Sequence, residues 1–397
     1  MSVLTIYNHG SGGSSLKGAY KGEIVNLFGN NDRSPMFTGK IITEGVGSIG
    51  DPDLQGIFGS RDATTGAYTL LVETDLRSGI WGSIVQLKNN ITGAGVDANV
   101  HTVLSIIKTL NLAGKRPDAI NMLGWSRGAV TCIRIAYFLH NMQDPNLRSI
   151  PINIFAVDPV AGPGHNAEPD AYTLTPNVRN YVATLMVDER RAAFKPISDL
   201  RLVVKDPKYT QSLILPFKGI HSDTAKNTTA TGKISFNLAL RFLYTHGTNV
   251  DAMAHYCLSN YQCWQYYEDI LLNRNDAYSK PQGKVKAFFV GGGTAVRDVD
   301  STRYVDDDFF INAHAKALFL TEFNQTFRAY FGIGKSTRNT LPWGQMYSPL
   351  IVQEMKRLDP EIVYRLESLT AEQHPSPNMA ALGLDQIGII RENRLVD

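Results

Sequence analysis

The chain has 397 residues, of which 43% are hydrophobic and 19% are charged, and its formal net charge at pH 7 is +2. These proportions are those of an ordinary soluble globular protein that is long enough to bury a large core. The small net charge argues against the strongly basic surface that a nucleic-acid partner requires, so we expect no binding to DNA or RNA.

The first residues, MSVLTIYNHGSGG, predict a strand over residues 3–7 that leads into a loop rich in Gly and Ser over residues 10–15. No basic region precedes the apolar residues, and Asn8 and His9 interrupt them, so the stretch is not typical of a cleavable signal peptide. The chain contains no run of 18 apolar residues, which predicts that no helix spans a membrane. We therefore expect synthesis in the cytoplasm without a signal peptide.

Strand and helix patterns alternate over the first 245 residues, which is typical of an α/β fold with a mainly parallel central sheet flanked by helices. Short apolar runs predict further strands over residues 41–43, 69–72, 119–123, 152–157, 181–187 and 213–216. Apolar residues at helical spacing predict helices over residues 99–110, capped by Asp97, and over residues 129–139 and 235–243.

The pattern changes beyond residue 248, where aromatic residues and helical segments dominate. We expect a core over residues 1–248 and a mainly helical extension over residues 249–397. The extension forms either a lid or membrane-docking surface or a layer that covers one face of the sheet. Aromatic residues at helical spacing are more often core, which favours the covering layer. The acidic residues 306–308 are consecutive rather than alternating, so we expect a solvated loop and no calcium site.

One segment matches the G-x-S-x-G motif, in which a serine sits on a sharp, strained turn between a buried strand and a helix. It reads Gly124-Trp125-Ser126-Arg127-Gly128, with an apolar predicted strand before it and an apolar predicted helix after it. We predict that Ser126 is a nucleophile and that the Arg127 backbone N–H, at the start of the helix, stabilises an oxyanion. The alternative is a glycine-rich turn with a passive serine.

A serine hydroxyl becomes a good nucleophile when a histidine takes its proton and a carboxylate orients that histidine. His221 is the predicted base, because it lies in a Gly-Ile-His-Ser-Asp loop after the last predicted strand of the core. Two aspartates compete as the acid: Asp158 ends the first strand after the motif, and Asp188 ends the second. The later strand is the usual place in this chain order, so Asp188 is preferred and Asp158 is the alternative.

The second oxyanion donor is expected in the loop after the first strand, where glycines let a backbone N–H approach the substrate. We predict Ser11 and Gly12 for this role. A phosphate-binding loop is the competing interpretation. The loop lacks the Lys-Ser/Thr ending of a P-loop and does not complete the dinucleotide fingerprint G-x-G-x-x-G.

The cysteines, Cys132, Cys257 and Cys263, indicate neither a disulfide framework nor a zinc site, since they are few and odd in number and form no C-x-x-C pair. Cys132 lies among apolar residues and is expected in the core. We expect no metal and no cofactor.

These segments together resemble the α/β-hydrolase domain of type VI secretion phospholipase effectors and their bacterial and fungal relatives. The resemblance covers about residues 1–245. It is carried, in chain order, by His9-Gly10-Ser11-Gly12-Gly13, Gly45-Val46-Gly47-Ser48, Gly93-Ala94-Gly95-Val96-Asp97, Gly124-Trp125-Ser126-Arg127-Gly128-Ala129, the D-E-x-R-x-x-F-x-P stretch over residues 188–196, and Gly219-Ile220-His221-Ser222-Asp223. Two departures stand out: His9 replaces the usual aspartate, and Thr224-Ala225-Lys226-Asn227 replaces a glycine-rich stretch.

The resemblance implies an α/β-hydrolase fold, a Ser126–Asp188–His221 triad and hydrolysis of phospholipid or another acyl ester. It also implies export by a specialised secretion system, with a carrier or immunity protein as a partner and a membrane surface as a site of action. Two other functions stay open. One is an esterase that acts on soluble small acyl substrates, and the other is a non-enzymatic interaction module.

Overall fold

The computed structural model of the chain describes residues 2–13, 22–45, 95–162, 165, 167–191, 193–272, 297, 312–318, 382 and 384. The predicted strand over residues 69–72 and the acidic residues 306–308 lie outside the described residues, as do Val46 to Ser48 of the second glycine-containing turn.

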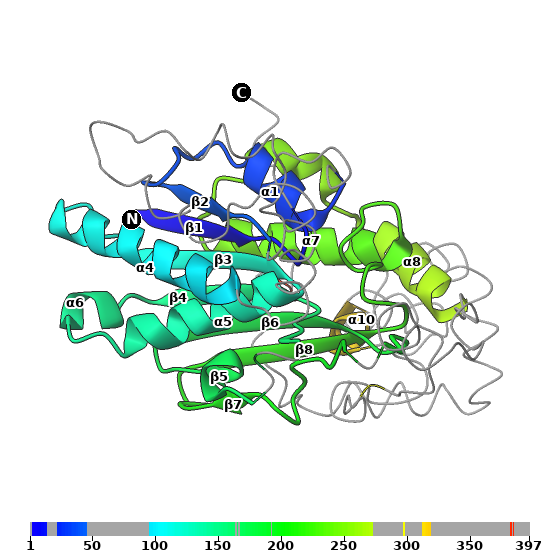
Figure 1. Ribbon diagram of the computed structural model, residues 1–397. Helices are drawn as coiled ribbons and strands as arrows, with labels where there is room; N and C mark the ends of the chain where they lie inside the picture. The colour runs from blue at the N-terminus through cyan, green and yellow to red at the C-terminus, as the bar shows by residue number, and fades with distance from the viewer. Residues whose placement is uncertain are drawn as a thin grey trace, which may run out of the picture.

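Six parallel strands form the central sheet, in the order β2-β1-β3-β4-β6-β8 (Figure 1). Their bounds are β1 Val3–Asn8, β2 Lys40–Thr43, β3 Ala119–Trp125, β4 Ile152–Val157, β6 Val178–Met186 and β8 Gln211–Phe217. The predicted α/β class with a mainly parallel sheet is therefore confirmed. A separate two-stranded sheet, β5 (Thr173–Leu174) with β7 (Val203–Val204), was not predicted.

Helices cover both faces of the sheet (Figure 1). On one face lie α4 (Gly95–Leu112), α5 (Arg127–His140) and α6 (Pro145–Arg148), and on the other lie α1 (Ile24–Asn31) and α7 (Ala230–Thr245). The strands are apolar on both sides because both sides are covered: Leu123 and Phe155 join the cluster under α7, while Met122 and Ile154 join the cluster under α5.

Helices α4, α5 and α7 begin before their predicted first residues, and α6 was not predicted. Helix α4 begins at Gly95, four residues earlier than predicted. Asp97 is therefore not a cap but lies in the first turn, where its carboxylate is 2.6 Å from Arg134 Nη1. Helix α1 was not predicted, and its N-cap is the Glu23 carboxylate, which accepts from the backbone N–H groups of Val25 and Asn26.

The described helices beyond residue 248 pack on the α7 face. They are η4 (Asp251–Tyr256), α8 (Asn260–Leu272) and α10 (Ala313–Leu318), and their buried side chains belong to the same cluster as those of α7. These helices therefore cover part of the α7 face, while the division of the chain at residue 248 and the role of residues 249–397 stay predictions. Among the described helices, none combines the length and the apolar character needed to cross a membrane.

The strand order places a topological switch point between β1 and β3. From β1 the chain moves to β2 on one side, and it then returns through α4 to β3 on the other side. In open α/β sheets, ligands bind outside the carboxyl ends of the strands at such a point. The loop after β1 and the turn after β3 flank it here.

Candidate active site

The candidate residues follow the carboxyl ends of parallel strands in the central sheet. Ser126 follows β3, Asp158 follows β4, and His221 lies four residues after β8. Because the strands are parallel, these ends meet at one edge of the sheet. Residues that are up to 95 positions apart in the sequence are thereby brought to one edge.

Ser126 has a strained backbone. Its φ of 58° is positive and its ψ is −124°, a combination that residues with a side chain rarely adopt. The turn is possible because glycines flank it: a Cβ atom would lie 2.4 Å from Gly128 O if added at Gly124, and 2.0 Å from Asn8 O if added at Gly128. The Ser126 N–H donates to Val157 O at 2.9 Å, which fixes the turn to β4.

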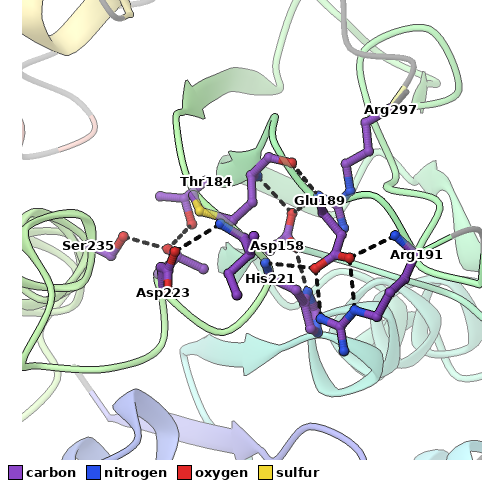
Figure 2. A network of polar contacts seen from close by, with 11 residues as sticks. Asp158, Thr184, Glu189, Arg191, His221, Asp223, Ser235 and Arg297 are labelled. Carbon is purple, nitrogen blue, oxygen red and sulfur yellow. Dashed lines mark hydrogen bonds and ion pairs between the residues drawn. The ribbon is translucent and has the colours of Figure 1, made fainter. Parts of the chain in front are cut away.

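His221 is paired with Asp158. Its Nδ1 lies 2.5 Å from Asp158 Oδ2, and both side chains are buried (Figure 2). The other carboxylate oxygen, Oδ1, accepts from the backbone N–H of Met186 at 3.0 Å and from Arg297 Nη1 at 2.5 Å. Asp158 itself has a φ of 41°, so the strand end that holds the acid is strained as well.

The preferred acid of the sequence analysis, Asp188, does not pair with His221. Its Oδ2 accepts instead from the backbone N–H of Gly219 at 2.7 Å. The structure therefore favours Asp158, the alternative, as the carboxylate partner of His221. The physical reason is that the chain turns sharply after β4 and directs the Asp158 side chain at the imidazole, while Asp188 lies beside the backbone of the His221 loop.

Three successive backbone N–H groups of the His221 loop each donate to a carboxylate (Figure 2 labels two of the three acids, Glu189 and Asp223). The pairs are Gly219 N with Asp188 Oδ2 at 2.7 Å, Ile220 N with Asp223 Oδ2 at 2.9 Å, and His221 N with Glu189 Oε2 at 3.2 Å. Hydrogen bonds to ionised acceptors are stronger than those between neutral groups. The acids of the predicted D-E motif therefore fix the backbone that carries His221.

Aromatic rings contact the imidazole on two sides. Trp125 is stacked on His221 with ring centroids 5.4 Å apart, and Phe194 meets it edge to face at 4.8 Å. The Arg191 guanidinium lies 3.7 Å above the Phe194 ring and makes two hydrogen bonds to Glu189 (Figure 2). The ring of His221 is thus held from the elbow strand and from the loop after β6.

Burial and charge set the proton affinities of the pair. Burial alone would raise the pKa of Asp158, but the Arg297 guanidinium and the hydrogen bond with His221 more than offset it and lower this pKa to about 2. Burial lowers the pKa of His221 below its usual 6.5, although Asp158 acts in the opposite direction. At neutral pH the pair is therefore a carboxylate and a neutral imidazole, which is the state of a general base.

Ser126 Oγ makes no hydrogen bond to any described residue, so it is not hydrogen-bonded to His221 in this structure. Ser126 is connected to His221 through Trp125, its neighbour in the chain, which carries the stacked indole. Contacts between a nucleophile and its base often tighten only when substrate is bound.

The predicted oxyanion donors lie on either side of the switch point. Arg127 is the first residue of α5, and its Nη1 donates to Ser11 Oγ at 3.0 Å. The loop after β1 turns at Gly12, which has a φ of 72°, and the Gly13 N–H donates to Gly10 O at 2.8 Å. Ser11 and Gly12 are therefore held beside the elbow, and their part in oxyanion binding stays a prediction.

His9, which replaces the aspartate of the resembled family, is fully buried at the same edge. Its Nδ1 lies 3.2 Å from Glu23 Oε2, the carboxylate that also caps α1. This residue ties the loop after β1 to the helix that follows it.

Sequence reasoning missed Arg297. It is separated from Asp158 by 139 positions, it belongs to no described helix or strand, and no motif surrounds it. Glu189 and Phe194 were recognised only as members of the D-E-x-R-x-x-F-x-P stretch, in which Asp188 was the predicted catalytic acid. Trp125 occupies a position that the G-x-S-x-G motif leaves open.

No protein-family model matches the chain, and no curated protein matches it. A crystal structure of an uncharacterized protein from Pseudomonas aeruginosa aligns with 97% of this chain at 13% sequence identity and a TM-score of 0.41. The chain spans 61% of the length of that protein. A likeness this weak carries no argument about family or function.

Proposed function

We propose that the chain is a serine hydrolase of the α/β-hydrolase type that cleaves carboxylic esters, with Ser126 as nucleophile, His221 as base and Asp158 as acid. One observation carries the proposal: a serine with a strained backbone of positive φ stands between a strand and a helix, at the sheet edge where a buried histidine–aspartate pair also lies. A passive serine has no need of the backbone strain, and a buried imidazole–carboxylate pair suits proton transfer.

Acylation begins when His221 takes the proton of Ser126 Oγ and the oxygen attacks the ester carbonyl. The carbonyl oxygen becomes an oxyanion that the Arg127 backbone N–H and an N–H of Ser11 or Gly12 stabilise. The imidazolium, stabilised by Asp158, then gives its proton to the leaving alcohol. The acyl group stays on Ser126.

Deacylation repeats the same steps with water. His221 takes a proton from a water molecule, which attacks the acyl-enzyme, and then returns the proton to Ser126 as the carboxylic acid leaves. No metal or cofactor enters this scheme.

The proposed substrate is a lipid ester, with phospholipid as the first candidate. The support is the ordered series of motifs that resembles type VI secretion phospholipase effectors. Export by a specialised secretion system, action at a membrane surface, and a carrier or immunity protein are parts of the same proposal.

The test measures fatty-acid release from mixed phospholipid vesicles and hydrolysis of a soluble short-chain ester, with wild type compared with Ser126→Ala. We expect release from vesicles that the substitution abolishes. Cleavage of the soluble ester alone would favour the small-substrate esterase. Activity on neither substrate would remove the support for an ester hydrolase and favour an interaction module.

A further inference from the structure

Arg297 reaches the candidate site from the C-terminal part of the chain. Its side chain is buried, and its Nη1 donates to Asp158 Oδ1 at 2.5 Å and to Met186 O at 2.8 Å. Figure 2 shows Arg297 on one side of Asp158 and His221 on the other. The carboxylate thus has a separate partner for each oxygen.

We infer that Arg297 is a positioning residue of the hydrolytic site: it fixes the Asp158 carboxylate and neutralises part of its charge, so that one oxygen alone faces His221. This inference rests on the proposed function, because it assigns Arg297 a part in the same Ser126–His221–Asp158 machinery.

The geometry supports a fixing role. Asp158 is fully buried, so water cannot hydrate its carboxylate, and a buried charge needs both a counter-charge and hydrogen bonds. The Met186 N–H and Arg297 Nη1 both bind Oδ1, which prevents the carboxylate from rotating and keeps Oδ2 on His221 Nδ1. Since Nη1 also donates to Met186 O, Arg297 ties the ends of β4 and β6 together.

The charge of Arg297 also acts on the base. Charged side chains act on His221 from several elements: Asp158 favours its protonated form, Arg297 and Arg191 disfavour it, and Glu189 accepts from its backbone N–H. Removal of Arg297 takes away one cation and leaves Asp158 with its full charge against the imidazole. The pKa of His221 therefore rises, and more of the base is protonated at a given pH.

The test uses Arg297→Met, which removes the charge, and Arg297→Lys, which keeps it. Within the described residues Nε and Nη2 of Arg297 have no hydrogen-bond partner, so a single lysine ammonium can replace the contacts of Nη1. Arg179→Met is the matched control, since Arg179 is exposed near the opposite end of β6.

We expect Arg297→Met to move the acid limb of kcat/KM on a soluble ester to higher pH. The loss is about tenfold at pH 6 and under about threefold at pH 9, because the base is deprotonated again at high pH. Arg297→Lys restores most of the activity, and Arg179→Met leaves the profile unchanged. An acid limb that stays at its wild-type position in Arg297→Met would overturn the inference.

A second readout does not depend on catalysis. The His221 ring is titrated by NMR in histidine-labelled full-length chain, with the signal assigned by His221→Gln. A pKa of His221 that rises in Arg297→Met and returns in Arg297→Lys supports the inference even if no hydrolysis is found, which would count against the proposed function alone. An unchanged titration overturns the inference even if the enzyme is active.

If Arg297→Met does not fold, the double variant Asp158→Asn/Arg297→Met tests whether Arg297 and Asp158 form a buried ion pair. Removing one partner of a buried ion pair leaves the other charge buried without a counter-charge, which destabilises the fold. Removing both partners leaves no such charge. Recovery of a folded protein in the double variant supports the pairing, and failure to recover contradicts it.

Discussion

The Trp125 indole and the His221 imidazole are stacked, with ring centroids 5.4 Å apart and planes inclined by 26°. Trp125 is the last residue of β3 and precedes Ser126, so the strand that carries the proposed nucleophile also supports the proposed base. Gly10 lies against the same indole, where a Cβ atom would be 2.7 Å from Trp125 Cε3. One side chain therefore connects the elbow, the base and the loop after β1.

Shortening that side chain is expected to misplace His221. Trp125→Ala lowers kcat about 10–100-fold, because small displacements of a catalytic group have large effects on rate. Trp125→Phe stays within about threefold, since it keeps a ring, and Trp125 Nε1 has no hydrogen-bond partner among the described residues. Steady-state kinetics with both variants test this, and a Trp125→Ala enzyme with wild-type kcat would show that the stack does not position the base.

The two aspartates give opposite expectations. Asp158→Asn lowers kcat about 10³–10⁴-fold, because the amide cannot stabilise an imidazolium and favours the wrong tautomer of His221. Asp188→Asn stays within about threefold, since an asparagine oxygen still accepts from the Gly219 N–H. Kinetics and thermal unfolding are measured for both. A large loss in Asp188→Asn with Asp158→Asn nearly intact would return the acid role to Asp188.

Ser126 variants separate chemistry from strain. Ser126→Ala and Ser126→Gly both lose kcat at least ~10³-fold, because the nucleophile is absent. The glycine variant has a free energy of unfolding about 1 kcal/mol above that of the alanine variant, since glycine adopts the φ of 58° without strain. Urea unfolding of the two inactive variants makes the comparison. Equal stabilities would mean that the elbow stores no strain.

The pH dependence follows from the two pKa values. Burial keeps the pKa of His221 below 6.5, so kcat/KM falls on the acid side with a midpoint below pH 6.5, while Asp158, with a pKa of about 2, stays ionised. A midpoint above 6.5 in a kcat/KM profile on the soluble ester would contradict this.

The free energy of unfolding should also depend on pH through His221 and Asp158. Below pH 6.5 the unfolded chain takes up a proton at His221 that the folded chain resists, so this residue lowers stability as the pH falls. The contribution of Asp158 is present above its unfolded pKa near 4 and disappears only as the pH falls toward 2. Urea unfolding of wild type and His221→Gln between pH 5 and 8 measures the histidine part, and equal slopes against pH would contradict it.

The strands were predictable because a parallel strand covered on both faces is apolar along its length. Residues 152–157 were predicted as a strand and form β4, Ile152–Val157, in which every residue is buried. Helix α1 escaped prediction because Asn26, Gly29, Asn30 and Asn31 interrupt its apolar residues, and its stability comes from packing of Ile24, Val25 and Phe28 on the sheet.

The site was predictable only as far as local patterns reach. The elbow and the His221 loop have local signals, since glycines mark both turns. The choice between Asp158 and Asp188 depends on the direction in which the chain leaves two strands that are equally apolar. The residues around Asp158 contain no sequence signal for the sharp turn that the backbone makes there. Arg297 depends on a contact across 139 positions, which no window along the sequence can detect.

Because Ser126 and Arg297 are far apart along the chain, the ribosome synthesises them at different times. About 170 residues separate them, and at the usual rate of synthesis a ribosome needs roughly 10–30 s to translate that interval. A growing chain therefore holds its elbow, Asp158 and His221 well before the arginine that binds Asp158 exists. A chain that stops short of residue 297 carries all three and still lacks the cation beside the acid, so the finished site belongs only to chains that ribosomes carry past this point.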